Sequence, residues 1–394
     1  MRVILAADVG STFTKLTAID IQARRVIGSA KSFTTIETNV MEGFHHAEAE
    51  LAKQCGPLTF EKRLASSSAA GGLKMVAVGL VPDLTVQAAR LASANAGAKI
   101  LKTYAYELSR DEVAEIVSLG PDMLLLSGGI DGGNKDVILH NARLLAASGL
   151  RCSLVAAGNK SAADDLKAIL KDFGEVIFCA NVMPEINRLD IEPAKRAIRD
   201  LFIKNIITAK GLDELQATLD ADIIPTPLSV LDAAALLSKG TKTVPGLGEL
   251  MVFDVGGATT DVYSMSEGLP TRSNVFLRGF RQPFAKRTVE GDLGLRYSMA
   301  SLTEAAGGPE EVAGRAGVSE AEVEAWLAAA RQTPDMLPEA GSGGKEIDEA
   351  LAALAVKIGM ERHCGSVEAV YTSTGQAWAQ TGKDLSNVAC VIGT

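Results

Sequence analysis

The chain has 394 residues, of which 47% are hydrophobic and 22% are charged. This composition is typical of a globular protein, and at about 100–200 residues per domain it indicates several domains. It excludes collagen-like and wholly disordered classes. The 39 Lys and Arg and the 48 Asp and Glu give a formal net charge of −9. Because no long basic run is present, we expect no nucleic-acid partner and no membrane binding.

The cysteines and histidines indicate a reduced chain without a structural metal. The cysteines are widely spaced and form no Cys-x-x-Cys pair, so they are expected to be free thiols; they are Cys55, Cys152, Cys179, Cys364 and Cys390. The four histidines show no ligand spacing. The first apolar run, Val3–Ala7, is too short for a signal peptide. We therefore expect a cytoplasmic protein whose partners are small ligands and other proteins.

Short apolar runs separated by turns open the chain. Three antiparallel strands are predicted at Arg2–Asp8, Phe13–Asp20 and Val26–Phe33. A helix is predicted over Val40–Cys55.

From residue 74 to about residue 205, apolar runs alternate with helical stretches, which is typical of a parallel α/β unit. The predicted strands are Met75–Val81, Lys99–Thr103, Met123–Ser127, Ser153–Ala157 and Val176–Cys179. The predicted helices are Asp83–Ala96, Asp111–Leu119, Lys135–Ser148, Ser161–Asp172 and Pro193–Lys204. Glycines near the helix ends are expected to terminate them; they are Gly97, Gly120, Gly149 and Gly174.

The strand-turn-strand pattern returns later in the chain, at Leu250–Asp254 and Thr260–Met265. A polar stretch rich in Ala and Glu predicts helical structure over Thr303–Arg331. A loop rich in Pro, Gly and Ser at Thr333–Gly344 separates it from a predicted helix at Glu346–His363.

One eight-residue motif occurs twice, each time directly after an apolar strand. Asp8-Val9-Gly10-Ser11-Thr12-Phe13-Thr14-Lys15 aligns with Asp254-Val255-Gly256-Gly257-Ala258-Thr259-Thr260-Asp261. In each copy an aspartate ends the strand, and a glycine permits a tight turn whose backbone N–H groups can approach an anion. Hydroxyl side chains supply further donors. The duplicated motif predicts a duplicated fold.

Two such turns facing each other would clamp a phosphate chain, so we expect Mg²⁺-ATP or ADP in a cleft between the repeats. The expected nucleotide contacts are Gly10, Ser11, Thr12, Thr14 and Lys15 in the first copy and Gly256, Gly257, Thr259, Thr260 and Asp261 in the second. Asp8 and Asp254 are the expected catalytic carboxylates, and they would hold Mg²⁺ through its waters. The alternative is an ordinary β-hairpin in each copy, but the pairing and the hydroxyl groups favour phosphate binding.

With these motifs the chain resembles the actin, Hsp70 and sugar-kinase superfamily of ATPases. The run Asp222–Pro227 and the helical stretch Leu228–Leu237 are similar to the connecting helix of that superfamily. Thr226 stands where the Hsp70 branch has a glutamate, so hydrolysis is expected to be slow or to use another group.

The resemblance implies an α/β fold with two RNase H-like domains and an inserted parallel α/β domain. The implied boundaries are residues 1–73 and 211–240 for the first RNase H-like domain, 74–210 for the insertion and 241–394 for the second.

Four further stretches resemble the GlmL/MutL family, the accessory proteins of adenosylcobalamin-dependent glutamate mutase, with relatives beside mutases such as ornithine aminomutase. They are Ser66–Met75, Ser127–Asn134, Pro283–Gly294 and Arg362–Gly365. The resemblance covers essentially the whole chain. It implies an ATP-dependent chaperone or reactivating factor whose partners are cobalamin-dependent mutase subunits, by analogy with diol dehydratase reactivase.

In that family the strand ending at Val391–Thr394 runs into further glycines, which contact adenosine in the superfamily. We therefore expect the second domain to be C-terminally truncated in this chain. A longer form is expected to bind nucleotide more tightly.

Three other segments allow more than one interpretation. The glycine-rich run Gly128–Asn134 follows an apolar strand and is either a ligand-binding loop or a plain connection. The charges at Lys286, Arg287, Glu290 and Asp292 favour a solvated face over a role in nucleotide or domain-closure contacts. Ser66–Ser68 indicates a tight crossover rather than a catalytic serine, because no histidine and carboxylate accompany it nearby in the sequence.

Two other ATP-dependent functions are compatible with the same clamp. A small-molecule kinase or a hydantoinase/oxoprolinase-type ATPase needs a substrate base near the γ-phosphate, and no carboxylate is clearly spaced for that task. An iron–sulfur activator of dehydratases needs cysteine ligands, and the scattered cysteines disfavour it. A slow ATPase that acts on a mutase is the favoured interpretation.

Overall fold

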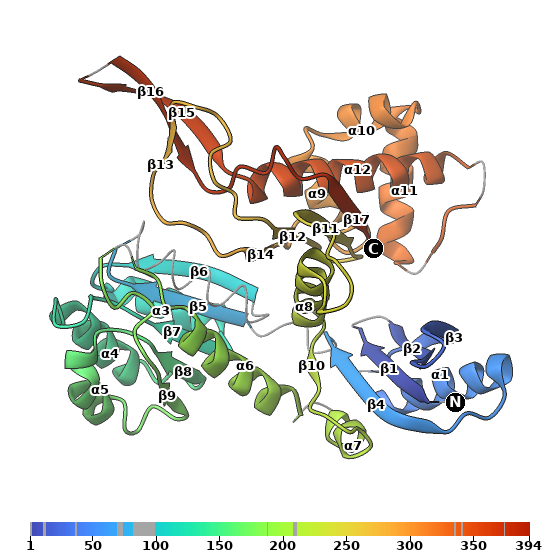
Figure 1. Cartoon of the computed structure of the whole chain (residues 1–394), viewed down its shortest axis with the longest axis horizontal. Coiled ribbons are helices and arrows are strands. Elements are labelled where there is room, and N and C mark those ends of the chain that lie inside the picture. Colours follow the sequence, from blue (N-terminus) through green and yellow to red (C-terminus); the bar gives the residue numbers. More distant parts are fainter. Residues whose placement is uncertain are drawn as a thin grey trace. The chain divides into compact units, whose positions relative to one another are not determined.

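The computed structural model describes residues 2–10, 13–35, 38–68, 74–81, 99–186, 188–207, 211–334, 336–339, 342–373 and 375–394. The chain divides into two compact units, Met1–Val230 and Leu231–Thr394 (Figure 1). All five cysteines are free thiols, as predicted. Within the described ranges, no helix has both the length and the apolar character needed to cross a membrane.

The first unit opens with a five-stranded sheet in the order β10-β4-β1-β2-β3. Its strands are β1 (Val3–Val9), β2 (Phe13–Asp20), β3 (Arg25–Phe33), β4 (Phe60–Ser67) and β10 (Ile224–Pro225). β1, β2 and β3 are antiparallel neighbours, which confirms the three predicted strands. β4 pairs in parallel with β1, and β10 pairs in parallel with β4. β4 was not predicted, because its charged start at Glu61–Arg63 hides the apolar alternation.

Helix α1 (Val40–Cys55) covers one face of this sheet and was predicted at both ends. Alternate residues of β1 and β2 are buried in one core with the apolar stripe of the helix, as in Leu5, Leu16 and Phe44, each at most 1% exposed. The helix begins at Asn39, whose side chain accepts a hydrogen bond from the N–H of Met41 at 2.8 Å.

A second sheet in the same unit is parallel throughout and has the order β6-β5-β7-β8-β9. Its strands are β5 (Lys74–Gly79), β6 (Lys99–Ala105), β7 (Met123–Leu126), β8 (Ser153–Ala156) and β9 (Val176–Phe178). In chain order this is a 2-1-3-4-5 arrangement, with a topological switch between β5 and β7. Every residue of β7 and β8 is buried, as expected for strands covered on both faces.

The helices of this parallel unit agree with the predictions to within a few residues, apart from one. They are α3 (Arg110–Leu119), α4 (Asp136–Ala147), α5 (Ala163–Ile169), preceded by the 3₁₀ turn Lys160–Ala162, and α6 (Glu192–Ile207). Gly120 ends α3 in the left-handed conformation, at φ 54°, as predicted. The predicted helix Asp83–Ala96 and Gly97 lie outside the described residues. Helices α7 (Leu212–Ala217) and α8 (Thr226–Lys239) follow this region.

The second unit repeats the topology of the first sheet, in the order β14-β12-β11-β17. Its strands are β11 (Leu250–Val255), β12 (Thr260–Met265), β14 (Ala285–Glu290) and β17 (Cys390–Gly393). β11, β12 and β14 are antiparallel like β1, β2 and β3, and β17 is parallel to β11 as β4 is to β1. This duplication confirms the predicted fold class, with two RNase H-like sheets and an inserted parallel α/β unit. The exact domain boundaries stay a prediction.

Helices of the second unit pack behind its sheet and beside it. They are α9 (Met299–Ala305), α10 (Pro309–Ala316), α11 (Glu320–Gln332) and α12 (Gly343–His363). The stretch Thr303–Arg331 is largely helical, as predicted, but glycines divide it into the end of α9, α10 and α11. Gly308 precedes a proline that starts α10, and Gly317 ends α10 at φ 71°. Ser319 then starts α11 with a reciprocal capping box to Glu322.

A small third sheet in the second unit was also missed by the sequence patterns. It has the order β13-β16-β15, formed by β13 (Val275–Leu277), β15 (Ser366–Thr372) and β16 (Gly375–Thr381). β15 and β16 form an antiparallel hairpin, to which β13 adds in parallel. Tyr371 is 85% exposed on this hairpin, so its aromatic residues did not signal a buried strand.

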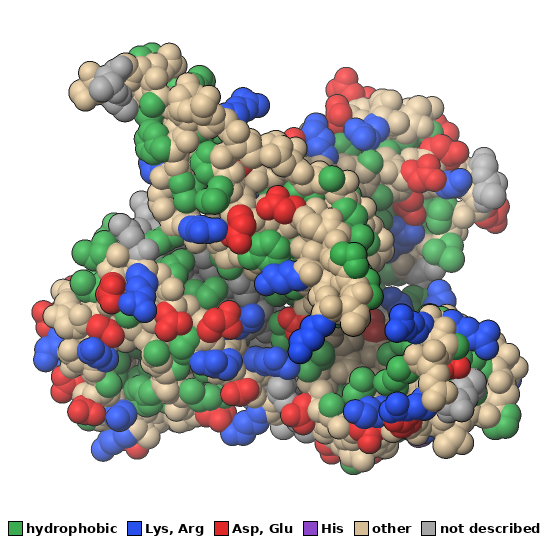
Figure 2. Space-filling model, in the orientation of Figure 1, with side chains coloured by type: hydrophobic (Ala, Val, Ile, Leu, Met, Phe, Trp, Pro, Cys, Tyr) green, Lys and Arg blue, Asp and Glu red, His purple; other side chains and the backbone are tan. Residues whose placement is uncertain are grey.

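Charged side chains are spread over both units. On the face drawn in Figure 2, Lys and Arg side chains lie among Asp and Glu side chains. Several form exposed ion pairs, such as Arg278 with Glu368 and Arg281 with Glu267. Such pairs contribute about 0–1 kcal/mol each, so the stability of the fold depends mainly on its buried cores.

Replacing Phe44 tests the packing of α1 on the first sheet. Phe44→Ala removes a ring that is 1% exposed, and it should lower the free energy of unfolding by about 3–5 kcal/mol. Phe33→Ala is the matched control, because the Phe33 ring is 55% exposed and its loss should cost about 1 kcal/mol or less. Denaturant titration measures both, and equal losses would contradict the placement of α1.

Candidate functional site

The first aspartate-glycine turn joins β1 to β2. The N–H of Gly10 donates to the carbonyl of Phe13 at 3.0 Å, which closes a tight turn. A Cβ at Gly10 would lie 2.8 Å from that carbonyl oxygen, so only glycine fits there. Ser11 and Thr12, expected to contact phosphate, lie outside the described residues.

Asp8 stands next to this turn and accepts two hydroxyl hydrogen bonds. Thr226 Oγ1 donates to Asp8 Oδ1 at 2.7 Å, and Ser66 Oγ donates to the same oxygen at 3.3 Å. Among the described residues, no Lys or Arg forms an ion pair with this carboxylate. Lys15 is the cross-strand partner of Asp8, and its side chain is exposed. Asp8 is therefore a partly buried carboxylate that pairs with no cation in the described part of the chain.

The second turn, between β11 and β12, has the same geometry. The N–H of Gly256 donates to the carbonyl of Thr259 at 2.9 Å, and a Cβ at Gly256 would lie 3.1 Å from that oxygen. Thr394 Oγ1 donates to Asp254 Oδ1 at 2.7 Å. As with Asp8, no cationic side chain in the described part of the chain pairs with Asp254.

Free donors point to an anion at the second turn. Within the described residues, the N–H groups of Gly257 and Ala258 and the hydroxyl of Thr259 have no hydrogen-bond acceptor. The carbonyl of Gly257, in contrast, accepts the N–H groups of Arg296 and Tyr297, each at 2.8 Å. The loop is thus held from one side and leaves these donors available, an arrangement that suits an anion such as a phosphate.

Two residues of the repeated motif turn inward instead. Thr14 and Thr260, equivalent in the two copies, are both 0% exposed. Thr14 Oγ1 lies 3.0 Å from Thr34 Oγ1, and Thr260 Oγ1 donates to the carbonyl of Leu293 at 2.6 Å. Their hydroxyl groups support the turns from behind, a role that the motif did not reveal.

Asp261, the last residue of the second motif, is also engaged within the protein. Arg287 donates to Asp261 Oδ1 through Nε at 2.7 Å, and its second nitrogen lies 2.6 Å from the same oxygen. Burial raises the pKa of Asp261, and the nearby guanidinium opposes that rise. The structure therefore brings Lys15 of the first copy near its aspartate on the exposed side, but places the equivalent Asp261 in the core.

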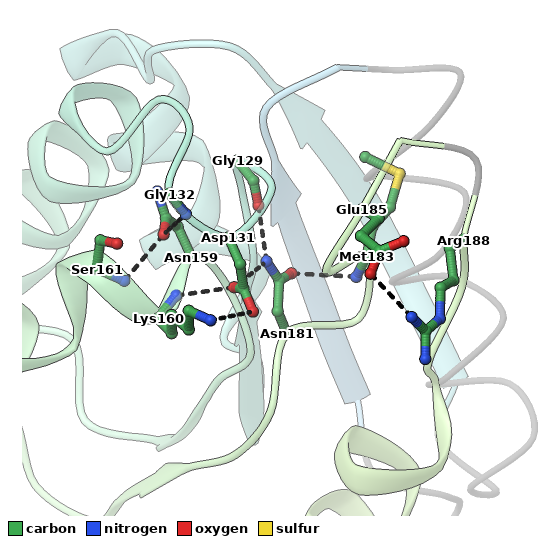
Figure 3. Close-up of polar contacts among 10 residues, drawn as sticks. All are labelled: Gly129, Asp131, Gly132, Asn159, Lys160, Ser161, Asn181, Met183, Glu185 and Arg188. Carbon is green, nitrogen blue, oxygen red and sulfur yellow. Dashed lines mark hydrogen bonds and ion pairs between the residues drawn. The ribbon is translucent and has the colours of Figure 1, made fainter.

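The glycine-rich loop Gly128–Asn134 follows β7, at the topological switch of the parallel sheet. Asn159 holds it in place. Its side chain accepts a hydrogen bond from the N–H of Gly132 at 3.1 Å (Figure 3). It also donates to the carbonyls of Gly133 and Asn134, at 2.9 and 3.1 Å. A Cβ at Gly129, whose φ is 71°, would lie 2.1 Å from the carbonyl oxygen of Asn134. The glycines are thus required by the fold of the loop itself.

Asn181 forms hydrogen bonds with the other side of this loop. Its side-chain nitrogen donates to the carbonyl of Gly129 at 2.9 Å and to Asp131 Oδ1 at 3.0 Å (Figure 3). Asp131 Oδ1 also accepts the N–H of Lys160 at 3.0 Å. These mutual contacts account for the polar side chains of the loop, and they favour a structural connection over a binding loop.

Comparison with known proteins identifies the family. The sequence model described as MutL protein matches residues 4–394. A protein of Clostridium tetanomorphum called Protein MutL is 46% identical over 399 residues, covering 100% of this chain and 86% of that protein. The chain belongs to the MutL protein family.

Similar solved structures include two kinds of protein. Xylulose kinase from Bifidobacterium adolescentis is 13% identical, with a TM-score of 0.26. The match covers 91% of this chain and 81% of the kinase chain. A glycerol dehydratase reactivase is 9% identical, with a TM-score of 0.26. That match covers 82% of this chain and 76% of the reactivase chain. Both TM-scores are too low to bear on function.

Two of the stretches that resemble the MutL family meet in the second unit. Arg362, at the end of α12, donates to Glu290 at 2.9 Å and to both oxygens of Asp292 at 2.8 and 2.9 Å. The hydrogen bonds from Arg362 lower the pKa of Asp292. Because Lys286 and Arg287 are only 7% and 5% exposed, the expectation of a solvated charged face was wrong for them.

A buried polar cluster lies behind this ion pair. His363 is 0% exposed, with Nε2 2.8 Å from Ser264 Oγ and Nδ1 2.8 Å from Thr288 Oγ1. Burial and the nearby ammonium of Lys286 lower its pKa. Burial also lowers the pKa of Lys286 to about 8 and that of Lys383 to about 7. Lys383 donates to the carbonyls of Ser266 and Phe284, both at 2.8 Å, and so ties β12 to the chain before β14.

Sequence reasoning missed the three hydroxyl residues that hold the aspartates. Ser66 was interpreted as part of a crossover, Thr226 as a missing glutamate and Thr394 as the last residue of a strand. The repeated motif contained no signal for them, because Ser66 and Thr394 come level with Asp8 and Asp254 only through the parallel pairing of β4 with β1 and of β17 with β11.

Asp261→Asn tests whether the buried ion pair supports the second turn. The substitution breaks the buried ion pair between Asp261 and Arg287, and it should lower the free energy of unfolding by about 3–5 kcal/mol. Glu267→Gln is the control, because Glu267 pairs with Arg281 at an exposed position and should cost less than about 1 kcal/mol. A loss for Asp261→Asn no greater than that of the control, measured by thermal denaturation, would contradict the structural role.

Proposed function

We propose that this protein binds Mg²⁺-ATP or ADP at its two aspartate-glycine turns and uses the nucleotide to act on a cobalamin-dependent mutase. One observation carries the proposal: two sheets of the same topology each end a central strand in a carboxylate that has no cationic partner among the described residues, beside a turn closed by the same glycine hydrogen bond. An ordinary hairpin requires neither the unpaired carboxylate nor its duplication.

The described residues fit the proposed nucleotide and metal. Mg²⁺ commonly keeps most of its waters and binds one or two carboxylates, so Asp8 and Asp254 would hold it through water. When bound, the metal would neutralise phosphate charge. Gly257 and Thr259 present free donors to a phosphate, and Lys15 supplies a cation on the exposed side of the first turn. Thr14, Thr260 and Asp261 keep the turns in place.

A cavity beside the second turn supports a nucleotide rather than a lone phosphate. It has a volume of about 390 Å³ and is lined mainly by residues of α9 and α11 and the chain before α9; they are Arg296, Tyr297, Met299, Ala300, Leu327, Ala328 and Arg331. Arg296 and Tyr297 connect it to the turn through the carbonyl of Gly257. Aromatic and guanidinium groups stack well on a planar base.

The mutase part of the proposal comes from the family. Membership in the MutL family, together with the whole-chain resemblance to glutamate mutase accessory proteins, favours a chaperone or reactivating role over a kinase. The ATP-binding turns would then supply a nucleotide-dependent change of conformation, and the partner would be a mutase subunit rather than a small substrate.

Removing both carboxylates tests the nucleotide site. Asp8→Asn combined with Asp254→Asn should abolish the Mg²⁺-dependent part of ATP binding, because neutral amides no longer attract a hydrated dication. Isothermal titration calorimetry measures the affinity with Mg²⁺ and with a chelator. Asp131→Asn is the control, since Asp131 lies in the loop after β7 and should leave the affinity unchanged. Unchanged Mg²⁺-dependent binding in the double variant would disprove the site.

An exchange assay tests the partner. The protein is mixed with a cobalamin-dependent mutase that has been inactivated with damaged cobalamin, and intact coenzyme and ATP are added. We expect damaged cobalamin to be released and mutase activity to return only with ATP and Mg²⁺. The double aspartate variant provides the matched control. ATP turnover without exchange, for glutamate mutase and for aminomutases alike, would contradict the accessory role and favour a kinase.

A further inference from the structure

Each aspartate of the repeated motif is held by a hydroxyl group from a neighbouring part of its own unit. Thr226 donates to Asp8 Oδ1 and Thr394 donates to Asp254 Oδ1, both at 2.7 Å. Ser66 adds a longer hydrogen bond to Asp8 at 3.3 Å. These contacts have no counterpart in the motif itself, because the donors lie on other strands.

Strand register shows that one of these contacts is part of the duplication. Asp8 pairs with Ser66 in the parallel ladder of β1 and β4. Phe253 pairs with Gly393 in the ladder of β11 and β17, so Thr394 comes level with Asp254. The N–H of Thr394 continues that ladder by donating to the carbonyl of Phe253 at 3.0 Å. A hydroxyl on the fourth strand therefore meets the aspartate of the first strand in both sheets.

Thr226 reaches Asp8 from the opposite side of β4. It directly follows β10, whose Ile224 pairs with Ser66. Thr226 is also the first residue of α8. Its hydroxyl donates to Asp8 Oδ1, a contact that the start of a helix does not require.

The chemistry of these donors suits carboxylates that must keep their charge. A hydroxyl group fixes the carboxylate plane and occupies Oδ1, but it leaves the negative charge in place. A lysine or arginine side chain would neutralise that charge. Within the described residues, Oδ2 of Asp8 and Oδ2 of Asp254 have no hydrogen-bond partner. In each carboxylate, Oδ1 is thus held by a hydroxyl group, and Oδ2 is left for solvent or a hydrated cation.

We propose that Thr226 and Thr394 are positioning residues, which orient Asp8 and Asp254 so that their free oxygens receive the waters of Mg²⁺. This inference rests on the proposed nucleotide site. Residues that orient the groups around a metal typically change its affinity by about 10- to 100-fold when they are replaced. The hydroxyls would therefore act on metal affinity and leave the affinity for metal-free nucleotide almost unchanged.

The test compares Thr226→Val and Thr394→Val with Thr226→Ser and Thr394→Ser in the whole protein. Valine keeps the shape and removes the donor, whereas serine keeps the donor. ATP affinity is measured by calorimetry over a range of Mg²⁺ concentrations and with a chelator. We expect each valine variant to need about 10- to 100-fold more Mg²⁺, the serine variants to remain within about threefold of the parent, and all to bind equally with the chelator.

The outcomes separate the two proposals. If the parent protein shows no Mg²⁺-dependent ATP binding, the proposed function fails and the positioning role fails with it. If the parent shows it and the valine variants match the parent, only the positioning role is wrong. An equal loss with Mg²⁺ and with the chelator would identify a general structural effect and also overturn the positioning role. Circular dichroism confirms that each variant is folded.

Discussion

The candidate site depends on one arrangement: a carboxylate at the end of a central strand, beside a tight turn that begins with glycine. The turn is closed by one backbone hydrogen bond, from Gly10 to Phe13 in one sheet and from Gly256 to Thr259 in the other. A Cβ at either glycine would crowd the acceptor carbonyl, so the close approach of the backbone in each turn favours glycine. The sheet order, repeated in both units, then decides which strand flanks the aspartate.

The charged side chains near the turn differ between the two units. In the second unit, Asp261 and Arg287 form a buried ion pair, and Arg362 joins α12 to the chain after β14. The first unit has an exposed Lys15 at the position of Asp261. The two halves are therefore built alike but carry different charges at this point. The first turn therefore has an exposed cation beside its aspartate, whereas the second has a buried ion pair.

Much of the fold followed from local patterns, since strands and helices with clear apolar periodicity were predicted to within a few residues. α1 was placed at both ends because its stripe is regular and Asn39 caps it. β4 was missed because its first half is charged, and β15 because its hairpin is exposed. The division of the stretch after residue 298 into three helices depended on glycines whose effect on a helix varies with context.

The candidate site was only partly predictable. The repeated motif located both aspartates and both turns, because each occupies a continuous run of sequence. The hydroxyl donors Ser66, Thr226 and Thr394 come from other strands, and only the parallel register brings them to Asp8 and Asp254. The buried state of Thr14, Thr260 and Asp261 was equally hidden, since burial is decided by the layers packed on the sheet.

Hydrogen–deuterium exchange with mass spectrometry tests the central claim most directly, namely that both turns bind the same Mg²⁺-nucleotide. Peptides covering residues 7–16 and 252–261 are compared in the free protein, with ATP and a chelator, and with Mg²⁺-ATP. The account predicts that Mg²⁺-ATP slows exchange in both peptides at the same nucleotide concentration, while a peptide covering the loop at residues 128–134 does not change. Protection of neither turn, or of one turn alone, would contradict it.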